Sequence, residues 1–206
     1  MQIDRIPVIS AMYFGPVDLY RSLAGHAAAI VDAGEHYQRQ SHRNRMRIIG
    51  PNGPQDLVVP IVRRSGEKMP MHTVGISYAE SWPQQHLHAI RSAYGKTPWY
   101  IHFADGIEQL LLARHERLID LDIASMRMCI KWLGIVCELK VSDRYMEDPP
   151  IDLRDRFHPK KDLIQLKDRV PEYPQVFADR HGFAPRLSVL DLLCNCGPQA
   201  TRYLLR

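Results

Sequence analysis

The first 34 residues of the chain pass from a strand pattern to a helical pattern and back, and this constrains the fold more than any other feature. Residues 3–10 predict a strand, and 17–30 predict a helix, because leucine and alanine recur there at helical spacing. The apolar run 28–34, AAIVDAG, ends at a glycine and predicts a second strand. Strand, helix and strand within so short a span favour a parallel crossover unit.

The middle of the chain changes from strands to helices. Short strands are predicted at 46–49 and 57–62, joined by a linker dense in Gly, Pro and Asn that indicates a hairpin, and another at 74–78. Over 83–133, apolar residues recur at helical spacing in three stretches, and Gly134 stands where the third helix should end.

The C-terminal part completes the predicted fold. The run 135–141 predicts a strand, the polar stretch 143–174 a long ordered loop with short helices, and 186–198 a helix that ends at a Gly-Pro pair. These patterns predict an α/β fold with a mixed, partly parallel sheet flanked by helices and a helical middle segment; the alternative is α+β. We expect a single domain over 1–206, with 83–133 as the helical subdomain if the chain divides at all.

The small excess of basic over acidic residues limits the kinds of molecule that the protein is expected to bind. Lys and Arg number 27 against 23 Asp and Glu, and the sequence pI is about 8.9. This mild excess suits a small anionic substrate, whereas a dedicated nucleic-acid binder carries a stronger field. The chain has no run of 18 apolar residues, so no membrane span is predicted, and its N-terminus lacks the apolar stretch of a secretory signal. With its four cysteines expected to be reduced thiols, the chain is predicted to be cytoplasmic, in a bacterial type of cell.

The stretch AYGKTP, residues 93–98, is similar to the end of a phosphate-binding P-loop but fails two tests. That motif needs a glycine where Ile90 stands, and it follows a strand rather than a predicted helix. We therefore expect Gly95 to end one helix and Thr97 to cap the next. The chain also has no dinucleotide-binding glycine pattern, so no cofactor is predicted.

Two pairs of potential metal ligands do not fit a site. Cys194 and Cys196 lie two positions apart on a predicted helix, so they point to different faces, and His86 and His88 diverge for the same reason. We expect the two cysteines to act as small buried apolar residues and predict no metal.

Residues 38–47, QRQSHRNRMR, crowd four arginines into ten positions. If this segment leads into a strand, Arg43 and Arg45 lie on one face and repel each other unless something negative sits between them. That partner is either an external anion or an internal carboxylate, for which Asp18, Asp32 and Glu35 are candidates. The candidate anion-binding residues in the segment are Gln38, Arg39, Arg43, Asn44 and Arg45.

Asp191 stands in a predicted helix otherwise made of Val, Leu and Cys. Burying an isolated carboxylate is costly, so this side chain must reach water or hold a partner, and one of the arginines would serve.

Five segments, taken in order, resemble one known family. They are YFGP at 13–16, EHYQRQSHRNRMRIIGPNG at 35–53, LVVPIVR at 57–63, WPQQHLHAIRSAYGKTPWY at 82–100 and YPQVFADRHGFAPRLSVLDLLCNCGPQA at 173–200. In this order they are similar to the WbqC-like family of bacterial proteins. The chain departs from the family pattern at Pro174, Arg186, Cys194, Cys196 and Gln199, and the last replaces a carboxylate.

The resemblance implies a role near polysaccharide gene clusters, especially O-antigen loci, and suggests transfer of a small acyl or aminoacyl group to an amino sugar. The arginines would then hold the carboxylate or phosphate of a nucleotide-linked sugar or activated donor. Asp191 or Glu35 would orient an amine, and Tyr37 or Tyr94 would stack or donate a hydrogen bond. The candidate catalytic residues are Asp191, Glu35 and Tyr37, and Tyr94 and Gln175 join the substrate-binding set. No Cys-His or Ser-His pair can be assigned, which favours direct attack by the amine.

Two rival functions remain open. In the first, the chain is a non-catalytic partner protein whose Arg-Asn-Arg segment is a buried hub of ion pairs. In the second, it binds the acceptor end of an aminoacyl-tRNA through a surface stripe that includes Arg63, Arg64, Lys160 and Lys161. The hub predicts that each guanidinium meets a carboxylate of the same chain, whereas the transferase predicts unpaired donors.

Overall fold

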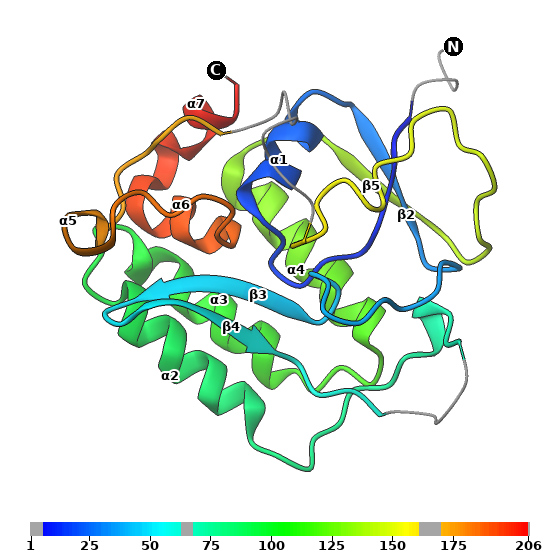
Figure 1. Cartoon of the computed structure of the whole chain (residues 1–206), viewed down its shortest axis with the longest axis horizontal. Helices are drawn as coiled ribbons and strands as arrows, with labels where there is room; N and C mark the ends of the chain where they lie inside the picture. The colour runs from blue at the N-terminus through cyan, green and yellow to red at the C-terminus, as the bar shows by residue number, and fades with distance from the viewer. Residues whose placement is uncertain (1–5, 63–67, 161–169, 206) are drawn as a thin grey trace.

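The strands of the protein form two sheets (Figure 1). The structure is a computed structural model and describes residues 6–62, 68–160 and 170–205. The larger sheet has the order β1-β2-β5 and is parallel throughout. Its strands are β1 (Val8–Ile9), β2 (Ala28–Asp32) and β5 (Glu138–Ser142). The mixed α/β class predicted from the sequence is confirmed.

Helix α1 (Val17–Ala24) connects β1 to β2, and this confirms the predicted parallel crossover. The helix is shorter than the predicted 17–30, because Gly25 ends it and Ala28 onward belongs to the central strand. Strand β2 pairs with both neighbours: Ile30 is opposite Val8 on one side and Lys140 on the other.

The loop after β5 returns along the outer edge of β1. The Val8 backbone N–H donates to the Ile151 carbonyl at 2.9 Å, and the Leu153 N–H donates to the Val8 carbonyl at 2.8 Å. This pairing brings residues 152–155 to the end of the parallel sheet. The short helices expected within 143–174 are not found among residues 143–160 and 170–174, and the remainder lies outside the described residues.

The predicted hairpin is confirmed as β3 (Arg45–Gly50) and β4 (Gly53–Val58), which pair antiparallel around a tight turn. The second strand starts earlier and ends earlier than predicted, at Val58 instead of residue 62. The strand predicted at 74–78 is wrong: Gly75 and Ile76 form only isolated bridges, because each pairs with a different segment.

The helical middle is confirmed as α2 (Trp82–Tyr94), α3 (Tyr100–Leu112) and α4 (Leu118–Leu133), preceded by the short helix η2 (Met71–Thr73). Gly134 adopts a φ of 65° and ends α4 as expected. The prediction for Thr97 is wrong: its hydroxyl donates to the Tyr94 carbonyl and so closes α2, and α3 begins after Trp99.

The C-terminal segment contains α5 (Ala178–His181), α6 (Val189–Cys196), η4 (Gly197–Gln199) and α7 (Ala200–Leu204). The Ser188 hydroxyl accepts the Leu190 N–H and caps α6. Helix α6 packs against α1, α2, α3, α4, α7 and β3, so nearly all of its residues are buried, and Cys194 and Cys196 are buried free thiols as expected. One hydrophobic core takes residues from both sheets and from all three middle helices.

None of the helices in the described part of the chain has the length and hydropathy that a bilayer span requires.

Candidate functional site

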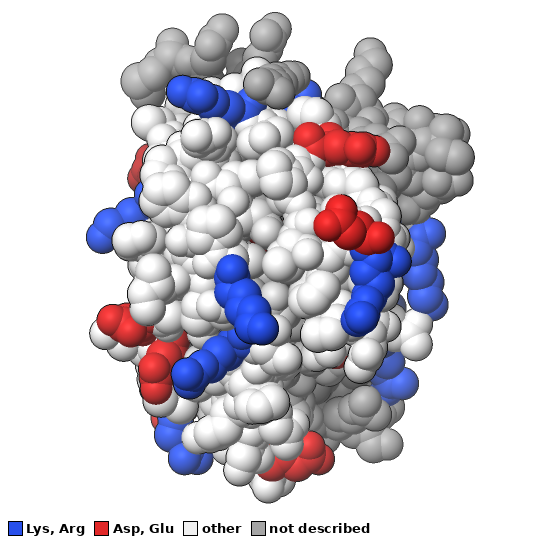
Figure 2. Space-filling view, turned by 90° about the vertical axis from the view of Figure 1, so that its left-hand side faces the viewer, with Lys and Arg blue, Asp and Glu red and all other residues white. Residues whose placement is uncertain are grey.

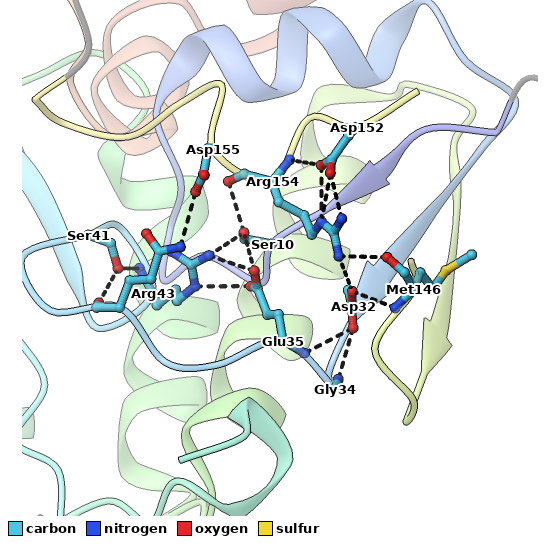
Figure 3. Close-up of polar contacts among 11 residues, drawn as sticks. Ser10, Asp32, Gly34, Glu35, Ser41, Arg43, Met146, Asp152, Arg154 and Asp155 are labelled. Atoms are coloured by element: carbon cyan, nitrogen blue, oxygen red, sulfur yellow. Dashed lines mark hydrogen bonds and ion pairs between the residues drawn. The ribbon is translucent and has the colours of Figure 1, made fainter. Parts of the chain in front are cut away.

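The polar residues of the chain gather where the parallel strands end. Open parallel sheets bind ligands beyond the carboxyl ends of their strands, so this edge is the first place to look for a site. Ser10 follows β1, Asp32 is the last residue of β2, and Glu35 lies three positions further on. Figure 3 shows these side chains with Arg43 and Arg154, which reach the same edge from two loops.

Asp32 fixes the backbone at this edge. Its Oδ1 accepts the N–H groups of Gly34 and Glu35, both at 3.0 Å, and its Oδ2 accepts the Met146 N–H at 3.1 Å and Arg154 Nη1 at 2.7 Å (Figure 3). A buried carboxylate with four donors is fully satisfied, so Asp32 is held as an anchor. It determines where Glu35 points.

Arg154 joins two carboxylates at the rim of the edge. Besides Asp32, its guanidinium makes a fork with Asp152, with Nη2 at 2.5 Å and Nε at 3.0 Å, and it lies 4.6 Å from the ring centre of Tyr145. Sequence reasoning did not single out Arg154, because it lies in the unpatterned stretch after β5.

Arg43 is the member of the arginine segment that reaches this edge. It makes a fork with Glu35, with Nε at 3.0 Å from Oε1 and Nη2 at 2.6 Å from Oε2, and Nη2 also donates to the Ser10 hydroxyl at 2.8 Å. The side chains of Arg43 and Glu35 are 2% and 5% exposed. Burial raises the pKa of Glu35, while Arg43 and Ser10 oppose that shift. Glu35, one of the three carboxylates named from the sequence as possible partners of the arginines, is thus the partner of Arg43. The Nη1 group of Arg43 makes no hydrogen bond to a described residue.

Asp122 lies on α4, close to this pair, and sequence analysis missed it. It is completely buried, and neither carboxylate oxygen accepts a hydrogen bond from a described residue. Burial raises its pKa well above the usual range; the charge of Arg43 lowers it and that of Glu35 raises it. Asp122 and Arg43 nevertheless form no ion pair with each other. Its place at helical spacing from the apolar residues Leu118, Ile119 and Met126 was the signal that would have found it.

The loop after β1 separates Asp122 from the aromatic residues of α2. The Tyr13 hydroxyl lies 3.0 Å from Nδ1 of His86, and both side chains are buried. Burial lowers the pKa of His86 to about 4, and it raises that of Tyr13, with a smaller contribution from Asp122. A neutral imidazole and an intact phenol therefore face this side of the edge at neutral pH.

The remaining arginines of the segment are paired on the hairpin. Arg45 and Arg47 both contact Asp56, at 3.1 and 2.7 Å, and the Asn44 side chain donates to the Val59 carbonyl at 2.9 Å. Arg39 is exposed and has no ion pair with a described residue. The predicted anion-binding set is thereby divided, because Arg43 and Arg45 have different carboxylate partners.

Gln38 and Tyr37 lie beside the edge where the parallel strands end. The Gln38 amide donates to Asp155 at 3.2 Å. Tyr37 is half-buried, and its backbone N–H donates to the Met69 carbonyl.

Three other predicted residues form a second buried cluster around Asp191. The Gln175 amide donates to Asp191 at 2.9 Å and Asn195 donates at 3.3 Å, and the buried side chains of Tyr173 and Tyr94 lie close to this carboxylate. Burial raises the pKa of Asp191 to about 6 against these hydrogen bonds. Asp191 thus holds partners, as the sequence required, but they are amides and phenols instead of an arginine.

Groups of His, Cys, Asp and Glu that could hold a metal ion are not found within residues 6–62, 68–160 and 170–205.

Comparison with known proteins identifies the family and nothing narrower. No curated protein and no solved structure matches the chain. The model of the WbqC-like protein family matches residues 11–157 and 153–203, which together include both buried clusters apart from Ser10. The chain belongs to the WbqC-like protein family.

Proposed function

We propose that this protein is a transferase of bacterial surface-polysaccharide or amino-sugar metabolism, which moves a small acyl or aminoacyl group onto an amino sugar. Its substrates would bind beyond the carboxyl ends of β1 and β2. Membership of the WbqC-like family supports the first part of the proposal, and the polar edge in Figure 3 supports the second.

A single observation carries the proposal: Asp122 is completely buried near enough to Arg43 to feel its charge, yet neither of its carboxylate oxygens has a hydrogen bond to a described residue, and the two side chains form no ion pair with each other. A buried carboxyl group without a partner is costly, and a ligand that supplies a donor to Asp122 would relieve that cost. A small aminoacyl group has the required chemistry, because a carbonyl or carboxylate oxygen suits the guanidinium and an amine suits the carboxylate.

The state of the cysteines supports direct attack by the amine. All four thiols are buried in whole or in large part, and burial raises the pKa of Cys137 to about 11 and those of Cys129 and Cys196 to about 12. A thiol that keeps its proton is a poor nucleophile. The amine nitrogen would attack the carbonyl carbon of an activated donor, the donor's leaving group would depart, and Glu35 would accept the amine proton.

The test combines a ligand screen with a neutral isostere of Asp122. Nucleotide-linked amino sugars, activated acyl donors and amino acids are screened by thermal shift, since a ligand at a hundred times its Kd adds about 2.7 kcal/mol to the free energy of unfolding. We expect one of these classes to stabilise the wild type. Asp122→Asn should be at least as stable without ligand, because it removes a buried carboxylate, yet should lose the ligand-induced shift and the transfer activity. Asp56→Asn on the hairpin should keep both.

The non-catalytic alternative keeps one specific observation in its favour, the buried fork between Arg43 and Glu35. Under that alternative no screened molecule gives a thermal shift that Asp122→Asn removes, and the Asp122→Asn variant binds its partner protein normally.

The aminoacyl-tRNA alternative depends on a basic surface stripe. Three of the four residues of its expected stripe, Arg63, Arg64 and Lys161, lie outside the described residues. Figure 2 shows the face with α5 and the hairpin turn, where basic side chains stand singly or in pairs among acidic ones on a mostly uncharged surface. Stabilisation by a charged tRNA, and by none of the small molecules, would favour this alternative over the transferase.

A further inference from the structure

A groove runs between α2 and α3, apart from both polar clusters. Its volume is about 510 Å³, within the range of small-molecule pockets. The two helices lie side by side below the hairpin in Figure 1. None of its lining residues belongs to the edge at the end of the parallel sheet. The stretch 93–98, which fails as a P-loop, contributes part of one wall.

The groove wall is held in a fixed shape by contacts on its inner side. The Thr97 hydroxyl and the Thr97 N–H both donate to the Tyr94 carbonyl, at 2.6 and 2.8 Å. The Trp99 N–H donates to the Cys194 carbonyl of α6 at 3.2 Å, and the Trp99 ring covers Gly197 so closely that a Cβ there would overlap it. A wall anchored to the central helix needs little reorganisation to bind a ligand.

The charges of the groove face it from both helices. Arg91 and His88 come from α2, and Glu108 comes from α3. Burial raises the pKa of Tyr100, which lies between the helices; Arg91 opposes that rise and Glu108 adds to it. Both charges therefore act on the same space. Neither forms an ion pair with a described residue, and Arg91 is exposed.

An apolar surface completes the groove. Ile101 is 73% exposed, the most exposed large apolar residue of the three middle helices, and Leu87 of α2 lines the same groove. A groove lined by an arginine and by exposed aliphatic side chains complements an anion carried on an apolar body.

We propose that this groove binds a small amphipathic anion, an organic phosphate or carboxylate on an apolar body, with the anion at Arg91 and His88 and the body against Ile101. The arginine supplies a fork of donors that matches either anion, and Tyr100 supplies a hydroxyl beside it. The site is independent of the proposed transferase function, because it shares no residue with the edge of the parallel sheet.

The experiment titrates the full-length protein with phenyl phosphate and follows the Ile101 methyl signal by NMR. Benzoate in a parallel arm distinguishes a carboxylate from a phosphate ligand, and inorganic phosphate and phenol test each half of the probe alone. We expect a saturable shift with phenyl phosphate or benzoate and much weaker shifts with the two halves.

Variants locate the binding. Arg91→Gln should weaken the preferred probe about tenfold or more, through loss of charge-assisted hydrogen bonds. Ile101→Ser should weaken it several-fold, and Glu108→Gln should leave it unchanged or tighten it. Lys131→Gln on α4 is the matched control for loss of one exposed positive charge. All four positions are exposed, and thermal melting checks that each variant folds.

Three results would overturn the proposal: no saturable shift with either probe, equal weakening by Arg91→Gln and Lys131→Gln, or a shift of the Ile101 signal on dilution without probe. The last would mean that a second copy of the chain covers the groove.

Discussion

At the scale of single residues, the arginines of segment 38–47 differ in the carboxylate that each of them contacts. Arg43 turns inward to Glu35 and Ser10, whereas Arg45 and Arg47 share Asp56 near the surface. The same residue type therefore has two different energetic roles within five positions. Loss of one partner from a buried pair leaves a charge without compensation, while loss of an exposed pair changes little.

We predict that Arg43→Ala lowers the free energy of unfolding by about 3–5 kcal/mol, because Glu35 is left buried without its cation. Arg45→Ala should cost less than about 1 kcal/mol, since both partners are partly exposed. Urea denaturation of the two variants measures the difference. Equal losses would mean that the Arg43 fork contributes no more than a surface pair.

We also predict a pH dependence from Asp191. Its pKa is about 6 in the folded protein and 3.8 in the reference state, so between these values the folded state retains a proton that the unfolded chain has lost. The stabilising contribution is therefore full below about pH 4 and is lost as pH rises to 6, a change of about 3 kcal/mol.

The difference in free energy of unfolding between wild type and Asp191→Asn isolates this contribution, since His42 and His86 titrate in both proteins. Burial lowers the pKa of these histidines to about 3 and about 4, so their contribution has the opposite sign and falls as pH falls. A difference that stays constant from pH 4 to 7 would contradict the prediction.

At the scale of elements, the loops at the end of the parallel sheet pack so closely that one position requires glycine. A Cβ added to Gly34 would overlap the backbone of Arg144 and Tyr145, which belong to the loop after β5. Since backbone cannot move aside as a flexible side chain can, this contact fixes how the two loops meet. That approach also places the Met146 N–H and Arg154 on Asp32.

Gly34→Ala should therefore lower the free energy of unfolding by about 2 kcal/mol or more, through overpacking at this contact. Gly25→Ala is the matched control, because its nearest neighbour would lie 3.5 Å away and its φ of −85° suits any residue. The control should be neutral or slightly stabilising. Thermal melting compares the two, and a Gly34→Ala protein as stable as the control would show that the loop after β5 can shift.

At the scale of the whole molecule, the helical middle shares its core with both sheets. Helix α6 lies between α1 and the middle helices, and it also touches β3. Segments that bury one continuous core are expected to unfold together. The possible helical subdomain 83–133 would need a core of its own.

The three tryptophans allow a direct test, because Trp82, Trp99 and Trp132 all lie on or next to the middle helices. We predict that tryptophan fluorescence and far-UV circular dichroism give one coincident unfolding transition in urea. A fluorescence transition at lower urea than the circular dichroism transition would instead identify a separately unfolding helical part.

The sequence by itself determined the elements of this protein. Residue spacing and backbone preference within one segment determine the crossover, the hairpin, the middle helices and the Gly134 cap. Both can be recognised in the sequence. The errors arose where a segment's structure depends on its neighbours in space. Residues 74–78 have the composition of a strand but no continuous partner strand, and the Thr97 hydroxyl donates to the preceding Tyr94 carbonyl because α3 starts later.

The tertiary structure alone decided the site. Asp32 meets Arg154 across 122 positions of sequence, and Asp122 is brought to Arg43 by the packing of α4 under the end of the sheet. Many carboxylates and arginines in the chain would make equivalent pairs, so charge and spacing leave the partners undetermined. Which groups pair, and which buried groups are left without a partner, follows from where the elements lie in space, because electrostatic interactions depend on distance and burial.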